Sequence, residues 1–200
     1  MTPLKIAFSG PNGEDKTSAF MDLGSLLAKK GIHVYHSFSV LLDELPLDTA
    51  SMTPEFMREV WTAQIDMEKR AASKEAEVVI LGSSLMDVLC YSAWYRTRPL
   101  GRDWTWMRDA MSFFRSDGVY GYDQIYLTGE SRESIDYGMT DEREAWRSEM
   151  EVLFHHMWMS FFMLKHVRKE RVPWSRYWSH LAEAVDEIKA MLRDGEGGAR

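Results

Sequence analysis

The sequence predicts an α/β fold, a three-layer sandwich with a central parallel sheet, because short apolar runs alternate with segments of helical periodicity. A glycine-containing turn directly follows the first apolar run, which is typical of a strand that leads into a helix. Parallel strands need crossover helices, and these helices cover both faces of the sheet. Ligands bind such folds beyond the carboxyl ends of the strands, so the segments after each strand are the first candidates for function.

Predicted strands occupy four short apolar runs, at residues 4–9, 32–38, 77–81 and 122–128, and residues 171–174 are a candidate fifth strand. Predicted helices occupy residues 16–30, 53–72, 85–96, 104–114, 148–167 and 176–192. Gly31 is a stop signal for the first of these helices. The second helix has an explicit start, since Thr53 is a good N-cap and Pro54 suits the first turn.

Composition indicates one globular domain over residues 1–194, with a flexible tail at 195–200. The 200 residues are 45% hydrophobic and 28% charged, which excludes a disordered or fibrous chain. The net charge of −7 disfavours nucleic acid as a partner. The longest strongly apolar run, residues 157–164, is far shorter than the ~20 residues that span a bilayer. The single cysteine, Cys90, fits a reducing cytoplasm.

The turn after the first strand has the spacing of a phosphate-binding loop, G-x-x-x-x-G-K-[ST]. In such a loop backbone N–H groups surround a phosphate, a lysine contacts it and a hydroxyl binds Mg²⁺. Here Lys16 is the lysine and Thr17 is the candidate metal ligand. The predicted nucleotide-binding residues are Gly10, Pro11, Asn12, Gly13, Glu14, Asp15, Lys16, Thr17 and Ser18.

The loop departs from the pattern at its last glycine, which is Asp15. A carboxylate about 4 Å from a phosphate costs about 4 kcal/mol at an effective dielectric constant near 20, unless it turns away or is neutralised. Glu14 adds a second negative charge beside it. The loop therefore has the position of a phosphate-binding loop. Its position does not decide whether it still binds a nucleoside triphosphate.

With this loop and the order of strands, most of the chain resembles the P-loop nucleoside and nucleotide kinases. The resemblance is greatest to the small kinase-like ATPases of the thymidylate-kinase and nicotinamide-riboside-kinase type found in phages and bacteria. Gln64 and Glu68 match a family helix that carries these residue types four positions apart, and Asp87 and Tyr91 match the helix after the third strand. The resemblance implies ATP and Mg²⁺ as cofactors, catalytic roles for Lys16 and Asp87, and a segment near residues 129–147 that acts as a lid.

Three further family positions are altered. Gly82 and Ser83 stand where the family typically has an aspartate and an arginine, and Met139 stands at the expected lid arginine. Arg143 and Arg147 follow on the next helix and are candidate catalytic replacements. Phosphoryl transfer depends on positioning and charge neutralisation, so these changes indicate lost or rearranged machinery.

Two other features point to ligands or partners. Arg96 and Arg98 are candidates, with Gln64 and Tyr91, for binding the acceptor substrate, although solvated loop residues are the alternative for the arginines. Residues 154–164 are apolar around more than one helical face, which indicates either a core helix or a contact in a homodimer or with a protein partner.

Three functions remain open from the sequence. The leading hypothesis is a degenerate nucleotide-kinase-like protein that binds a nucleotide or phosphorylated small molecule with weak or no phosphoryl transfer. The second is an active kinase for a (deoxy)nucleotide or modified pyrimidine with a rearranged site. The third is a non-catalytic structural subunit of a larger assembly.

Overall fold

The computed structural model describes residues 2–10, 14–38, 53–96, 105–116, 121–127, 149–150, 152–154, 156–157 and 177–197. Four strands form one sheet, in the order β2 (Val34–Ser37), β3 (Val78–Leu81), β1 (Leu4–Ser9) and β4 (Gln124–Leu127). All three pairings are parallel, and Ile6 of the central strand β1 lies opposite Ile80 of β3 and Gln124 of β4. The predicted parallel sheet is confirmed.

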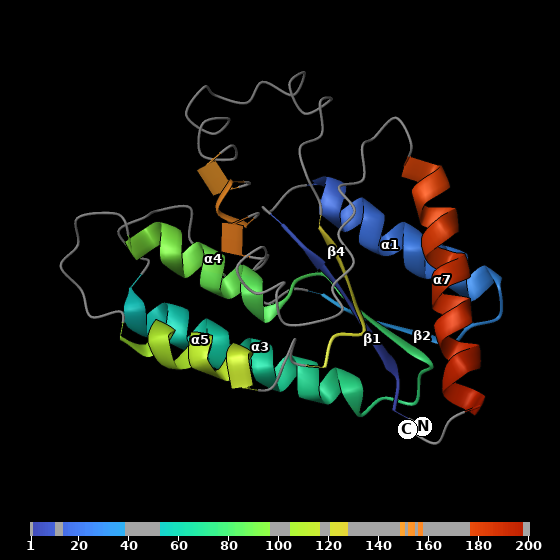
Figure 1. Cartoon of the computed structure of the whole chain (residues 1–200), viewed down its shortest axis with the longest axis horizontal. Coiled ribbons are helices and arrows are strands. Elements are labelled where there is room, and N and C mark those ends of the chain that lie inside the picture. The colour runs from blue at the N-terminus through green and yellow to red at the C-terminus, as the bar shows by residue number, and fades with distance from the viewer. Residues whose placement is uncertain are drawn as a thin grey trace.

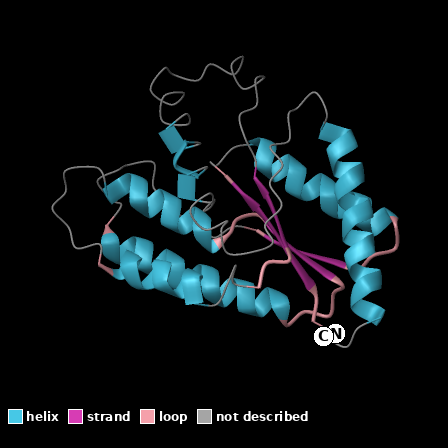
Figure 2. Ribbon diagram, in the orientation of Figure 1, coloured by secondary structure: helices cyan, strands magenta, loops and turns pink. Residues whose placement is uncertain are grey.

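Helices cover both faces of this sheet, as Figure 1 shows. Helices α1 (Glu14–Lys29) and α7 (Tyr177–Gly197) pack together on one face. Helices α3 (Pro54–Ala72) and α4 (Leu85–Arg96) pack together on the other, and α5 (Trp106–Ser116) contacts α4. The layers of helix, sheet and helix are also visible in Figure 2. The predicted three-layer α/β sandwich is therefore confirmed.

Alternation along β1 directs its side chains into two different environments. Leu4, Ile6 and Phe8 belong to the apolar core shared with α1 and α7. The intervening residues face α3 and α4, and two of them, Lys5 and Ser9, are polar and buried. The face of the sheet below α3 and α4 thus contains polar groups that need partners inside the protein.

Local signals set several helix ends as predicted. The Thr53 side chain accepts a hydrogen bond from the Phe56 N–H at 3.1 Å, and Pro54 occupies the first turn of α3. Gly31 follows α1 with φ of +81°, a conformation that side chains rarely adopt. Helix α7 continues to Gly197, beyond the predicted end at residue 192, because no breaker precedes Gly195.

Two predicted segments, the lid near residues 129–147 and the strand at 171–174, lie outside the described residues.

Among the helices that the structure does describe, none combines the length and the apolar character needed to cross a bilayer.

Candidate active site

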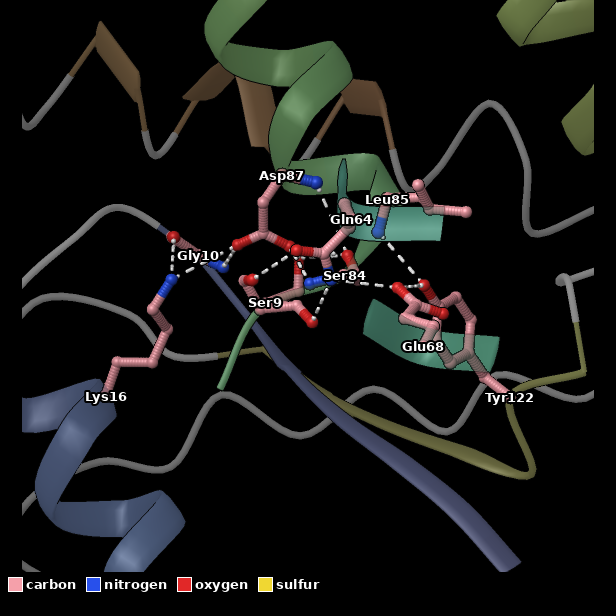
Figure 3. Close-up of polar contacts among 10 residues, drawn as sticks. Ser9, Gly10, Lys16, Gln64, Glu68, Ser84, Leu85, Asp87 and Tyr122 are labelled. Atoms are coloured by element: carbon pink, nitrogen blue, oxygen red, sulfur yellow. Dashed lines mark hydrogen bonds and ion pairs between the residues drawn. The ribbon is translucent and has the colours of Figure 1, made fainter. Parts of the chain in front are cut away.

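The centre of the candidate site is a buried ion pair between Lys16 and Asp87. Lys16 lies in the first turn of α1, and its Nζ is 3.2 Å from Asp87 Oδ1 near the start of α4. Lys16 Nζ also donates a hydrogen bond to the Gly10 carbonyl at 3.0 Å. Both charged side chains are almost fully buried, with 1% of Lys16 and none of Asp87 exposed. Figure 3 shows the lysine reaching the carboxyl end of β1, where this carboxylate meets it.

The Asp87 carboxylate accepts hydrogen bonds from four residues. Oδ1 accepts from the Gly10 N–H at 3.2 Å as well as from Lys16. Oδ2 accepts from the Ser9 hydroxyl at 2.8 Å and from both the N–H and the hydroxyl of Ser84. Five donors thus converge on two oxygens, which leaves little free acceptor capacity.

Residues Ser84 and Asp87 also form a capping box at the start of α4. The Ser84 N–H donates to Asp87 Oδ2 at 2.9 Å, and the Asp87 N–H donates to the Ser84 hydroxyl at 3.3 Å. A serine followed three positions later by an acidic residue is the usual sequence of this motif. The capping box fixes the direction of the Asp87 side chain, so the same local motif that starts α4 also places the carboxylate beside Lys16.

A second polar group lies next to this one, centred on the buried carboxylate of Glu68. Glu68 Oε1 accepts from the Tyr122 hydroxyl at 2.6 Å and from the Gln64 amide at 2.9 Å, and Lys5 Nζ lies 2.6 Å from Oε2. Burial, with the nearby Glu68 charge as the next cause, raises the pKa of Tyr122 well above its usual value of 10. The phenol therefore stays protonated and donates to Glu68.

The predicted site residues lie in different environments in the fold, and some lie outside the described part of the chain. Lys16 and Asp87 are brought together, although 71 positions separate them. Thr17 is partly exposed and Ser18 exposed in the first turns of α1, which also contains the backbone of Glu14 and Asp15. Predicted residues outside the described ones are Pro11, Asn12, Gly13, Arg98, Arg143 and Arg147, and Arg96 is described only through its backbone at the end of α4.

The two predicted acceptor-side residues on helices are buried. Gln64 is fully enclosed, and its amide group contacts the Ser83 carbonyl at 3.2 Å and the Ser83 hydroxyl at 3.3 Å. Tyr91 is buried in the same core as Phe154, and its ring packs edge-on with a centroid 5.8 Å from that of the Phe154 ring. A direct contact of either residue with a substrate stays a prediction.

Residues 149–157, where described, are helical, and Met150 and Phe154 are buried in the core that contains α4. The remainder of the apolar segment, residues 158–164, lies outside the described part of the chain. Cys90 is also in this core, and burial, followed by the charge of Asp87, raises the pKa of its thiol well above 9.0. A thiol held protonated in this way is unsuited to nucleophilic chemistry.

Sequence reasoning missed Ser9, Ser84, Lys5 and Tyr122 as members of these polar groups. Two local signals were available. The S-x-x-D pattern of residues 84–87 is a capping box, and Lys5 is a charged residue within an otherwise apolar predicted strand. Tyr122 has no such signal, because its partners come from α3 and from the start of α4.

Comparison with known proteins supports the fold. No protein-family model matches the chain, and no curated protein matches it by sequence. Among solved structures, the chain is similar to the NadR protein in complex with NR, with a TM-score of 0.66 and 18% identity over 94% of this chain. The chain spans 52% of that protein's length. At this identity the likeness concerns the fold alone, an α/β sandwich built on a parallel sheet.

Proposed function

We propose that this protein binds a nucleotide or another phosphorylated small molecule at the carboxyl end of β1, with weak or no phosphoryl transfer. The observation that carries the proposal is the position of Lys16, whose ammonium lies at the end of the central strand in a fold of the P-loop kinase type. A lysine and backbone N–H groups at this position are suited to the oxygens of a phosphate. The altered Asp15 beside Lys16 weakens the attraction for a polyphosphate.

The hydrogen bonds of Asp87 support weak transfer. A general base needs a free oxygen directed at the proton that it removes. Both oxygens of Asp87 accept hydrogen bonds from the protein, and Lys16 Nζ lies 3.2 Å from Oδ1. Catalysis by this carboxylate requires some of these bonds to break first.

The described residues fit Mg²⁺ only as a partner of bound phosphates. Within the described part of the chain, no group of three or more His, Cys, Asp or Glu side chains is arranged to hold a metal ion. P-loop proteins hold Mg²⁺ through nucleotide phosphates, a loop hydroxyl and one carboxylate. Thr17 is the residue that would hold it here, joined by Asp87 if the protein is an active kinase, and the ion would neutralise charge on the phosphate.

A second candidate function is an active kinase with a rearranged site. It is favoured by the 3.2 Å approach of Asp87 to Lys16, which supplies a carboxylate although Gly82 replaces the expected acid. In this case Arg143 or Arg147 would serve as the lid arginine. Gln64, Tyr91, Arg96 and Arg98 would line the acceptor side. The acceptor would be a deoxynucleoside monophosphate or a hydroxymethylated pyrimidine.

Calorimetric titration of ATP, ADP and dTMP, with and without Mg²⁺, tests the proposal. Wild type is compared with Lys16→Ala and with Lys29→Ala, which removes an exposed lysine from the far end of the same helix. Binding lost only in Lys16→Ala supports the proposal, and no binding of any ligand to wild type overturns it in favour of a structural subunit. Transfer of the ATP γ-phosphate at an enzyme-like rate, abolished by Lys16→Ala, establishes the second candidate instead.

A further inference from the structure

The buried carboxylate of Glu68 connects two arms of hydrogen bonds to the turn before α4. In the first arm, the Tyr122 hydroxyl donates to Glu68 Oε1 at 2.6 Å and accepts from the Leu85 N–H at 2.9 Å. In the second arm, the Gln64 amide donates to the same Oε1 at 2.9 Å and to the Ser83 carbonyl at 3.2 Å. The arms therefore reach the two residues on either side of Ser84, as Figure 3 shows for the first arm.

This arrangement is costly if it serves stability alone. Glu68 and Lys5 are charged groups at 1% and 9% exposure, and removing two charges from water costs several kcal/mol per ion. Well-packed apolar residues of similar volume are often as stabilising as such a pair. The distinctive property of the group is geometric, because a single oxygen atom, Glu68 Oε1, is linked through Gln64 and Tyr122 to both neighbours of Ser84.

Ser84 in turn determines where the Asp87 carboxylate lies. Its N–H and hydroxyl both donate to Asp87 Oδ2, and Asp87 Oδ1 then meets Lys16 and the Gly10 N–H. A shift of the turn would move the carboxylate relative to both partners. We propose that Glu68, with Gln64 and Tyr122, forms a positioning clamp that sets the turn at residues 83–85 and thereby holds Asp87 against Lys16 and the Gly10 N–H.

The clamp predicts a coupling that reaches from Tyr122 to Gly10. Tyr122→Phe removes one hydroxyl and leaves the ring in place, which deprives the Leu85 N–H and Glu68 of a partner. Because Gly10 donates to Asp87, its backbone N–H reports the position of that carboxylate without any ligand. Amide hydrogen exchange at Ile80, in the middle of the sheet, reports global unfolding for comparison.

In Tyr122→Phe we expect the amides of Leu85 and Gly10 to exchange at least tenfold faster than in wild type. This increase should exceed any increase at Ile80. The matched control is Tyr126→Phe, which removes a buried phenol hydroxyl from the α1 and α7 face of the sheet and should leave Gly10 unchanged relative to Ile80. If Tyr122→Phe does not fold, Gln64→Met removes the other arm and carries the same expectation. An increase at Leu85 alone, or equal increases at all three amides, overturns the clamp.

A second measurement connects the clamp to the proposed function, on which this part alone rests. Titration of Mg²⁺–ATP should give an affinity for Tyr122→Phe that differs at least tenfold from that of wild type, and an unchanged affinity for Tyr126→Phe. Equal affinity of the two variants contradicts a positioning role at the ligand site. Absence of binding to wild type removes the proposed function, while the exchange experiment still decides the clamp.

Discussion

Replacing Asp87 by asparagine isolates the charge of the central ion pair. Asparagine keeps the size of the side chain and retains one acceptor oxygen, so the capping box with Ser84 is weakened less than the pairing with Lys16. Lys16 is 1% exposed, and it would lose the charge of its paired carboxylate while keeping its hydrogen bond to the Gly10 carbonyl. A buried ammonium that has lost its paired carboxylate lowers the stability of the folded state.

The expected loss of stability is about 3–5 kcal/mol, the usual effect of removing one partner from a buried pair. For a chain of this length a loss of 3 kcal/mol lowers Tm by roughly 6–12 °C. Urea unfolding, followed by tryptophan fluorescence, measures the change in the free energy of unfolding. Folded domains usually have a free energy of unfolding of about 5–15 kcal/mol, and a domain near 5 kcal/mol would tolerate this loss only marginally. The variant should therefore be measured at low temperature in a stabilising buffer.

Two comparisons make the result decisive. Asp66→Asn removes an exposed carboxylate from α3 and should change the free energy of unfolding by less than about 0.5 kcal/mol. Lys16→Met combined with Asp87→Asn removes both charges, and the double variant should be more stable than the sum of the single losses predicts. Additive losses, or an Asp87→Asn variant as stable as wild type, would refute the reasoning that the pair is buried and coupled.

Three further predictions concern other parts of the fold. Burial lowers the pKa of His36 below its usual 6.5, so the unfolded chain takes up this proton at higher pH than the folded chain does, and stability should decline as pH falls below about 6.5. Thermal unfolding between pH 8 and 5 measures this decline, and His36→Phe, which keeps a ring against Phe20, should reduce it; an unchanged slope contradicts the assignment. Gly24→Ala places a Cβ 1.8 Å from His36 Nε2 and should destabilise the protein by about 1–3 kcal/mol. The same change in a His36→Ala background should instead stabilise α1 by up to about 1 kcal/mol, and a loss there would show that the clash is not with the ring. Thr53→Ala removes the N-cap of α3 and should cost about 1 kcal/mol in urea unfolding, whereas Thr62→Ala, at an exposed position within α3, should cost less.

The fold was predictable because its determinants are local. Short apolar runs predict all four described strands to within two residues at their ends. The N-cap at Thr53 and the left-handed Gly31 depend only on neighbouring residues, and both have the predicted role. Helix α7 extends to Gly197, beyond the predicted end at residue 192, because helices tolerate glycine in a last turn at modest cost.

The site was predictable only in part, because its contacts join distant segments. The loop spacing predicts a role for Lys16 and the resemblance to kinases implies one for Asp87, but no local pattern predicts that the two side chains meet. Lys5 lies in a strand and Glu68 in a helix, 63 positions apart, and nothing in either segment names the other as its partner. A charged residue in a buried strand indicates that a partner exists, but the topology of the sheet decides which one.

The carboxylate missing after β3 bears directly on whether the protein transfers phosphate. Gly82 stands where the resemblance to kinases implies an acid at the end of the strand, yet the capping box brings Asp87 to within 3.2 Å of Lys16. A phosphate that reaches Lys16 and the Gly10 N–H must replace this carboxylate or share them with it, and two anions about 4 Å apart repel by about 4 kcal/mol at an effective dielectric constant near 20.

The two proposed functions therefore predict opposite effects of Asp87→Asn on nucleotide affinity. If Asp87 competes with the ligand for Lys16, neutralising it should strengthen binding of ATP at least tenfold, both with and without Mg²⁺. If Asp87 instead holds Mg²⁺ in an active kinase, the same change should weaken binding only when Mg²⁺ is present, because the carboxylate then attracts the ion. Calorimetry of the folded variant under both conditions measures the sign, and unchanged affinity in both would show that the phosphate is bound away from Asp87.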